Sequence, residues 1–146
     1  IEDMNDIIWA INPRNASFVH IIDRLRNYAS RMTQSKDIAL DFRNDDSLHD
    51  IPFSMEQRKN LFLICKEAVN NSVKYSGCKN LEVKFEYSKK NLSVHVSDDG
   101  KGFDTGKGFE GNGLRNMKQR AEQIGTNISI HSSGSGSRIN FKMKVS

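Results

Sequence analysis

Apolar residues that recur every three or four positions predict three helices in the first half of the chain. The first covers residues 1–12 and is stopped by Pro13, which lacks an amide hydrogen. The second follows Ser17, a residue type that suits the N-cap position. Residues 54–57 have the form of a capping box, so we expect a long third helix from there to about Tyr75.

Alternating apolar and polar residues predict strands between and after these helices. The predicted strands cover residues 38–42, 81–87, 92–96, 127–131 and 138–145. The second and third strands would pair as a hairpin, and the last two would flank a turn at residues 132–137. Between these pairs, we expect a helix over residues 114–124, closed by Gly125.

This order of elements indicates an α+β fold. Alternation means that each strand buries one face, which favours a mixed, mostly antiparallel sheet. Helices must cover the buried face, so we predict a two-layer α/β sandwich with helices on one face of the sheet. The length of 146 residues suits a single compact domain.

Charge and cysteine content narrow the class of protein. The net charge of +4 comes from scattered basic residues, which argues against nucleic acid as a partner. Cys65 and Cys78 form no Cys-x-x-Cys pair, which favours a reducing, cytoplasmic location with free thiols. No apolar run is long enough to span a membrane. Because the chain starts without Met inside a predicted helix, we expect a segment of a longer protein, whose membrane anchor would lie elsewhere.

The long third helix has two faces of different chemistry. At 3.6 residues per turn, Glu67, Asn71 and Lys74 share one face. A core stripe lies opposite them, formed by Phe62, Cys65, Val69 and Val73. The polar face is either merely solvated or a metal–phosphate site, in which an amide oxygen holds Mg²⁺ and an ammonium meets phosphate.

A glycine-rich stretch follows the third predicted strand, and six of the ten glycines lie between Gly100 and Gly113. Asp98 stands at the strand end, where a carboxylate can accept a hydrogen bond from a purine amino group. Gly100 and Gly102 would let the backbone approach the base. The alternative is a common Asp-Gly hairpin turn.

The second half of this stretch fits neither of two familiar nucleotide-binding motifs. Residues 106–111 match Gly-x-Gly-x-x-Gly, but no strand immediately precedes them, and the Walker pattern also fails. Residues 111–114 instead open a helix, whose free amide groups attract phosphate. Residues 104–110 would then form a flap over the nucleotide.

Together these motifs resemble the Bergerat-type ATP-binding family of histidine kinases, gyrase-type ATPases and heat-shock chaperones. The segment from Glu67 to Ser76 looks like the N box, residues 98–103 like the G1 box, and residues 111–114 like the G2 box. The resemblance implies Mg²⁺ on Asn71 and a catalytic position for Glu67. The implied ATP-binding residues are Asn71, Lys74, Tyr75, Asp98, Gly100, Gly102, Phe103, Gly111, Gly113 and Leu114.

Further segments resemble the sensor histidine kinases of two-component systems. Residues 114–121 are similar to the subgroup with a short ATP lid, and residues 133–137 to its closing glycine-rich turn. Residues 6–13 resemble the end of a dimerisation helix. We therefore expect residues 1–13 to be that helix end and linker, and residues 14–146 to be the catalytic ATP-binding domain.

The resemblance implies transfer of the ATP γ-phosphoryl group to a histidine on an upstream dimerisation helix, then to an aspartate of a response regulator. None of the four histidines has the sequence context of that acceptor, so we expect it outside this chain, in a parent protein that is a homodimer. The alternatives are a serine kinase or conformational ATPase of the same fold, or a non-catalytic nucleotide- or partner-binding module.

Overall fold

The computed structural model describes residues 2–48, 51, 53–102 and 113–145. The helices are α1 (Glu2–Ile11), α2 (Phe18–Gln34), α3 (Met55–Tyr75) and α4 (Gly113–Gln123), with short 3₁₀ helices η1 (Pro13–Asn15) and η2 (Asp46–Leu48). The strands are β1 (Ala39–Asn44), β2 (Asn80–Ser88), β3 (Asn91–Asp98), β4 (Ser129–Ser133) and β5 (Gly136–Lys144). The predicted order of helices and strands is confirmed, and the two 3₁₀ helices add to it.

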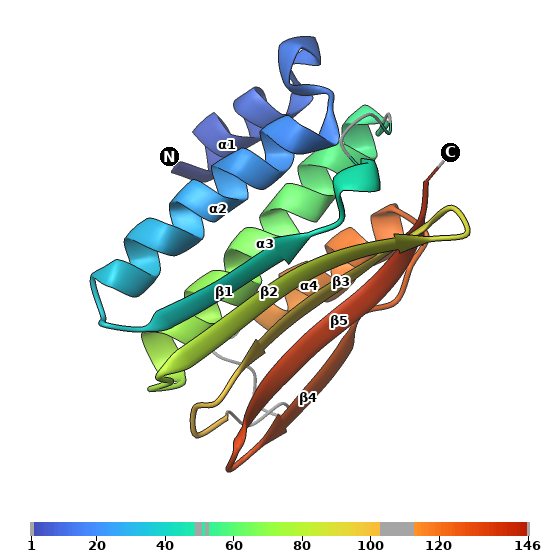
Figure 1. Cartoon of the computed structure of the whole chain (residues 1–146). Coiled ribbons are helices and arrows are strands. Elements are labelled where there is room, and N and C mark those ends of the chain that lie inside the picture. Colours follow the sequence, from blue (N-terminus) through green and yellow to red (C-terminus); the bar gives the residue numbers. More distant parts are fainter. Residues whose placement is uncertain (1, 49–50, 52, 103–112, 146) are drawn as a thin grey trace.

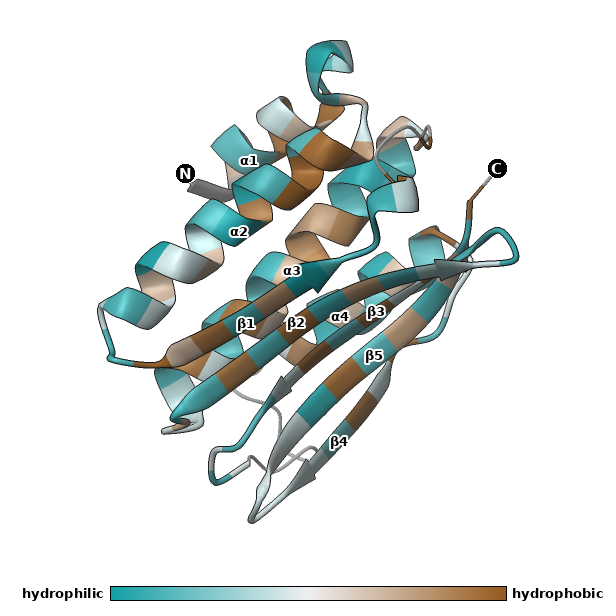
Figure 2. Cartoon of the chain, viewed as in Figure 1, coloured by the Kyte–Doolittle hydropathy of each residue, from teal (hydrophilic) through white to brown (hydrophobic). Residues whose placement is uncertain are grey.

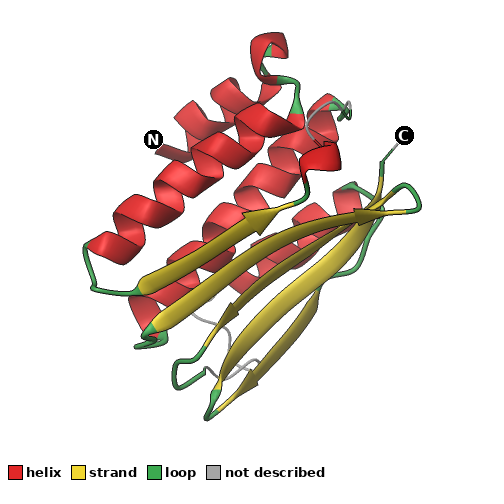
Figure 3. Cartoon of the chain, viewed as in Figure 1, coloured by secondary structure: helices red, strands yellow, loops and turns green. Residues whose placement is uncertain are grey.

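The strands form one sheet in the order β1-β2-β3-β5-β4. β1 runs parallel to β2, and the other neighbouring strands are antiparallel. All four α-helices lie on the same side of this sheet (Figures 1 and 3). The predicted two-layer sandwich with a mixed, mostly antiparallel sheet is therefore confirmed.

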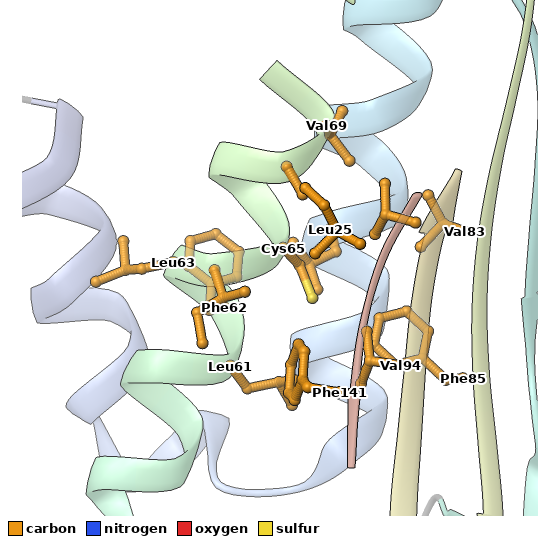
Figure 4. Close-up of a cluster of buried hydrophobic side chains, with 14 of the residues drawn as sticks. Leu25, Leu61, Phe62, Leu63, Cys65, Val69, Val83, Phe85, Val94 and Phe141 are labelled. Atoms are coloured by element: carbon orange, nitrogen blue, oxygen red, sulfur yellow. The ribbon is translucent and has the colours of Figure 1, made fainter. Parts of the chain in front are cut away.

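The core lies between the sheet and helices α2, α3 and α4. Apolar and polar residues alternate along β2, β3 and β5 (Figure 2), and the apolar residues are the buried ones that join the core with the helices. Leu61, Cys65 and Val69 on α3 point toward Val83 and Val94 of the sheet (Figure 4). Leu63 points to the other side of α3, so this helix presents a second face away from the strands.

Local signals fix both ends of α3. The Ser54 hydroxyl accepts a hydrogen bond from the Gln57 amide at 3.1 Å, and the Gln57 side chain accepts one from the Ser54 amide at 3.0 Å. This reciprocal pair confirms the predicted capping box. The helix ends at Tyr75, and Gly77 follows with a φ of +65°, which a residue with a side chain rarely adopts.

The predicted turn between the last two strands was wrong in detail, whereas the predicted N-cap position of Ser17 is confirmed. The turn predicted at residues 132–137 is narrower, because Ser133 pairs with Gly136 across the ladder and the strands therefore extend further into it. Ser17 does stand at the N-cap of α2, but its hydroxyl pairs with the His20 ring at 2.9 Å instead of capping a helix amide.

Helix α1 packs on α3 through the Trp9–Phe62 ring contact and through polar contacts. Asp6, only 6% exposed, forms an ion pair with Arg24 of α2 at 3.0 Å and a second ion pair with Lys66 of α3. The buried guanidinium of Arg58 donates to the carbonyl of Ala10 at 3.0 Å. These contacts attach α1 to the helix that carries the predicted site. Among the described helices, none has the length and apolar character needed to cross a membrane.

Candidate functional site

The polar face of α3 is confirmed as distinct from its core face. The predicted core stripe of Phe62, Cys65, Val69 and Val73 is buried. On the other face, Asn71 is 4% exposed, Glu67 is half-buried and Lys74 is exposed. Tyr75, half-buried, is the last residue of the helix. The face therefore passes from a buried amide to an exposed ammonium within one turn.

Asp98 ends β3 and faces the same helix. It is 9% exposed, and its Oδ2 accepts hydrogen bonds from the hydroxyls of Ser72 and Ser137, both at 2.6 Å. Its Oδ1 accepts from the amide of Gly100 at 2.9 Å. Within the described part of the chain, no cation lies within ion-pair distance of this carboxylate. Asp98 is thus a buried anion solvated by neutral donors.

The neighbouring Asp99 is exposed and has a different role. Its carboxylate accepts hydrogen bonds from the Asn80 side chain at 2.7 Å and from the backbone amides of Lys79 and Asn80, each at 2.9 Å. These bonds, the side-chain bond above all, lower the pKa of Asp99 to about 2. Asp99 therefore links the end of β3 to the start of β2, whereas the Asp98 carboxylate points into the interior of the protein, toward α3.

Gly100 and Gly102 allow backbones to meet beside Asp98. A Cβ on Gly100 would lie 2.4 Å from the Ser76 carbonyl oxygen, and one on Gly102 would lie 2.1 Å from that of Ser133. Gly102 also has a φ of +76°. Both glycines thus pack the G1-type turn against the end of α3 and the turn between β4 and β5. Any larger residue would push these segments apart.

Gly113, the first residue of α4, lies against the polar face of α3. A Cβ there would be 2.5 Å from Oε1 of Glu67 and 3.6 Å from Nδ2 of Asn71. Leu114 is 6% exposed and belongs to the core. The structure therefore brings Glu67 and Asn71 of α3 together with the start of α4. Phe103, Gly111 and the predicted flap at residues 104–110 lie outside the described residues.

A groove of about 1340 Å³ runs along the outer side of α3, between α1 and α2 on one side and α4 on the other. Glu67 and Lys74 line it, but among the described lining residues neither Asn71 nor Asp98 appears. The site is therefore defined by the contacts of Asp98 and Asn71, which lie beside this groove's lining rather than in it. Because Glu67 and Lys74 line the groove, the exposed end of the polar face of α3 is accessible from solvent.

The sequence reasoning missed Ser72 and Ser137, whose hydroxyls hold Asp98. Ser137 did carry a signal, since alternation along β5 places it on the same inward face as Ile139 and Phe141. A buried serine at an inward position needs a polar partner. Ser72 follows Asn71 directly and is 5% exposed, but helix periodicity alone does not show what it contacts.

The fold is that of a histidine kinase catalytic domain. The solved histidine kinase domain of the blue-light activated kinase from Erythrobacter litoralis EL346 superposes with a TM-score of 0.71 at 19% identity, covering 86% of this chain and 61% of that one. Residues 56–146 match the sequence model of the histidine kinase-, DNA gyrase B- and HSP90-like ATPases. The chain belongs to this family and is an ATP-binding domain, as its resemblance predicted.

Two relatives are named as kinase or sensor proteins. The histidine-protein kinase/phosphatase UhpB of Salmonella typhimurium is 26% identical over 94% of this chain. The sensor protein VraS of Staphylococcus epidermidis is 35% identical over 64% of this chain. The chain spans only 27% of the length of each relative. Both names agree with the predicted sensor kinase subgroup.

Proposed function

We propose that the chain is the catalytic domain of a sensor histidine kinase, which binds Mg-ATP and donates its γ-phosphoryl group to a histidine of the longer protein. Family membership and the names of the relatives support this proposal. The observation that carries it is the buried Asp98 carboxylate, which has no cationic partner among the described residues and accepts from two serine hydroxyls. Such a group is suited to a neutral donor on a ligand.

In this proposal, Asp98 accepts a hydrogen bond from the amino group of adenine. The hydroxyls of Ser72 and Ser137 can rotate, so one can release a lone pair of Asp98 when the amino group arrives. Gly100, Gly102 and Leu114 would shape the pocket around the base. Phe103 and Gly111 keep the roles implied by the resemblance, as a pocket and a lid residue.

The polar face of α3 would hold the phosphates. Nδ2 of Asn71 is buried, and no residue in the described part of the chain forms a hydrogen bond with it. Because the nitrogen and oxygen of an amide can exchange places, this position can present an oxygen, a ligand that Mg²⁺ prefers. The bound ion would neutralise phosphate charge. Lys74 is exposed and can reach phosphate oxygens, and Tyr75 would border them. The residues present therefore fit a Mg–phosphate group.

Phosphoryl transfer would proceed by attack of a histidine nitrogen on the γ-phosphorus. A P–N bond forms, the bond to the bridging oxygen breaks, and ADP leaves with that oxygen. The chain would contribute alignment and charge neutralisation, which dominate this chemistry. Glu67 lies on the same face and is the candidate to accept a proton or hold a metal-bound water.

The partners in this proposal are the protein's own dimerisation helix, in a homodimer, and a response regulator. Residues 1–13 would be the end of that helix and its linker, and residues 14–146 the catalytic domain. Cys65 and Cys78 are free thiols, which suits the cytoplasm, where ATP is also found. The parent protein would be anchored in the inner membrane.

Incubation of the longer protein with γ-labelled ATP tests the reaction. We expect label on the protein that is lost in acid but kept in base, as for a P–N bond. Acid-stable label would instead identify a serine kinase. Release of labelled phosphate without labelled protein would identify an ATPase. Binding of ATP with neither outcome would identify a non-catalytic module.

A further inference from the structure

The carboxylate of Glu67 occupies a specific place beside α4. The distance of 2.5 Å between its Oε1 and the Cβ position of Gly113 means that the carboxylate fills the space where a side chain would begin. Gly113 is the first residue of α4, an eleven-residue helix. The negative charge of Glu67 therefore lies at the helix N-terminus, which carries a partial positive charge.

The start of α4 lacks an anion of its own. Within the described residues, its first turn carries no acidic side chain, and Arg115 adds a positive charge. Helices are usually stabilised by acidic groups in this turn. Glu67 of α3 supplies that negative charge across the helix–helix contact.

A second group points to the same place. Nδ2 of Asn71, on a side chain 4% exposed, has no hydrogen-bond partner among the described residues and lies 3.6 Å from the Cβ position of Gly113. A buried amide without a partner is costly, so the site is built for a ligand that reaches this amide. The helix N-terminus and the unpaired amide together form a place for a phosphate group, to which Asn71 can donate from its nitrogen without metal, or present its oxygen to a phosphate-bound Mg²⁺.

We infer that Glu67 is a built-in anion at the N-terminus of α4, which the nucleotide phosphates must displace or repel in order to bind. The inference rests on the proposed function and adds a role for Glu67 in setting phosphate affinity. Binding would then exchange one anion for another at the start of α4. Glu67 would lower the affinity of the site for the nucleotide phosphates and leave the affinity for the adenine base unchanged.

Calorimetry of the chain with ADP, in EDTA, tests this exchange. We expect Glu67→Gln to bind ADP about fivefold more tightly than the wild type, the size of a charge effect at a helix terminus. Affinity for adenosine, which has no phosphate, should not change. Equal or weaker ADP binding by Glu67→Gln would overturn the inference while leaving the proposed function intact. Failure of both proteins to bind adenosine and ADP would overturn both proposals.

Two controls separate charge from packing. Glu122→Gln removes a carboxylate from the exposed, distant end of α4 and should leave ADP affinity unchanged. The gain in Glu67→Gln should also shrink as KCl is raised, because salt screens the repulsion. A gain that stays the same in high salt would show that packing is responsible and would overturn the inference. Thermal melting of each variant verifies that it is folded.

Discussion

Two buried aspartates, Asp6 on α1 and Asp98 on β3, show how the same side chain serves two purposes. Asp6 is 6% exposed and Asp98 is 9% exposed, so both are largely removed from water. Asp6 is paired with two cations, Arg24 and Lys66. Asp98 is paired with hydroxyls and backbone amides. Burial alone therefore does not distinguish a structural carboxylate from a binding one.

The difference lies in whether the charge is neutralised. The cations around Asp6 offset the cost of its desolvation and neutralise its charge, so the carboxylate has little electrostatic attraction left for a ligand. Arg24 is further held over the Trp9 ring, 4.6 Å from its centroid. The negative charge of Asp98 is solvated by neutral donors that can reorient. A ligand amino group can replace one of them without breaking an ion pair.

The largest effect should separate the two aspartates directly. We expect Asp98→Ala to weaken ATP binding by about 100-fold, since it removes hydrogen bonds to a charged acceptor in a buried site. Asp6→Ala should leave ATP affinity nearly unchanged. Calorimetry on both variants measures this contrast, and equal losses in the two would contradict it.

Stability should respond to Asp6. Asp6→Ala removes the carboxylate that forms ion pairs with Lys66 and Arg24. We expect the free energy of unfolding to fall by about 2–3 kcal/mol. This loss is smaller than that for a fully buried ion pair because Arg24 is partly exposed to water. Denaturant titration followed through Trp9, the single tryptophan, measures it. A matched control is Asp41→Ala, whose partner Arg43 is exposed. A loss of stability no greater than that of the control would contradict the claim that the ion pairs of Asp6 stabilise the attachment of α1.

The hydroxyls around Asp98 should have a smaller effect. Ser72→Ala removes one donor to Asp98, and we expect ATP affinity to fall about fivefold, in line with one net hydrogen bond. Ser93→Ala serves as the control, because Ser93 lies on the polar face of the sheet. If both serine variants bind ATP as the wild type does, the hydroxyl has no part in recognition.

The smallest effect concerns Asp99 and pH. Its folded pKa of about 2 is lower than the ordinary 3.8, so its hydrogen bonds stabilise the fold fully above pH 4 and lose that contribution as pH falls through about 2. Because Asp99 is exposed, the effect should be modest. Melting temperatures of wild type and Asp99→Asn should differ at pH 5 and converge near pH 2. A difference in melting temperature that grows as the pH falls would contradict this role of Asp99.

Local chemistry made much of the fold predictable. Alternation revealed the strands, the Ser54–Gln57 pair revealed the start of α3, and helix spacing placed Glu67, Asn71 and Lys74 on one face. Each of these signals lies within a few residues of the feature that it predicts. The glycine-rich stretch likewise marked where backbones meet closely.

Contacts between distant residues were beyond these signals. Asp6 and Lys66 are 60 positions apart, and Asp98 and Ser137 are 39 apart. The placement of β5 between β3 and β4 also depends on pairing across the sheet rather than on local pattern. The turn at residues 132–137 was misjudged because its serines and glycine pair across strands despite a turn-like composition.

Recognition of the adenine amino group by Asp98 is tested most directly by comparing ATP with inosine triphosphate. Inosine carries a carbonyl oxygen where adenine carries the amino group, so it would present an acceptor to the Asp98 carboxylate. We expect calorimetry to show that inosine triphosphate binds this chain at least about 30-fold more weakly than ATP, in proportion to a lost charged hydrogen bond. Equal affinity for the two nucleotides would contradict the role of Asp98.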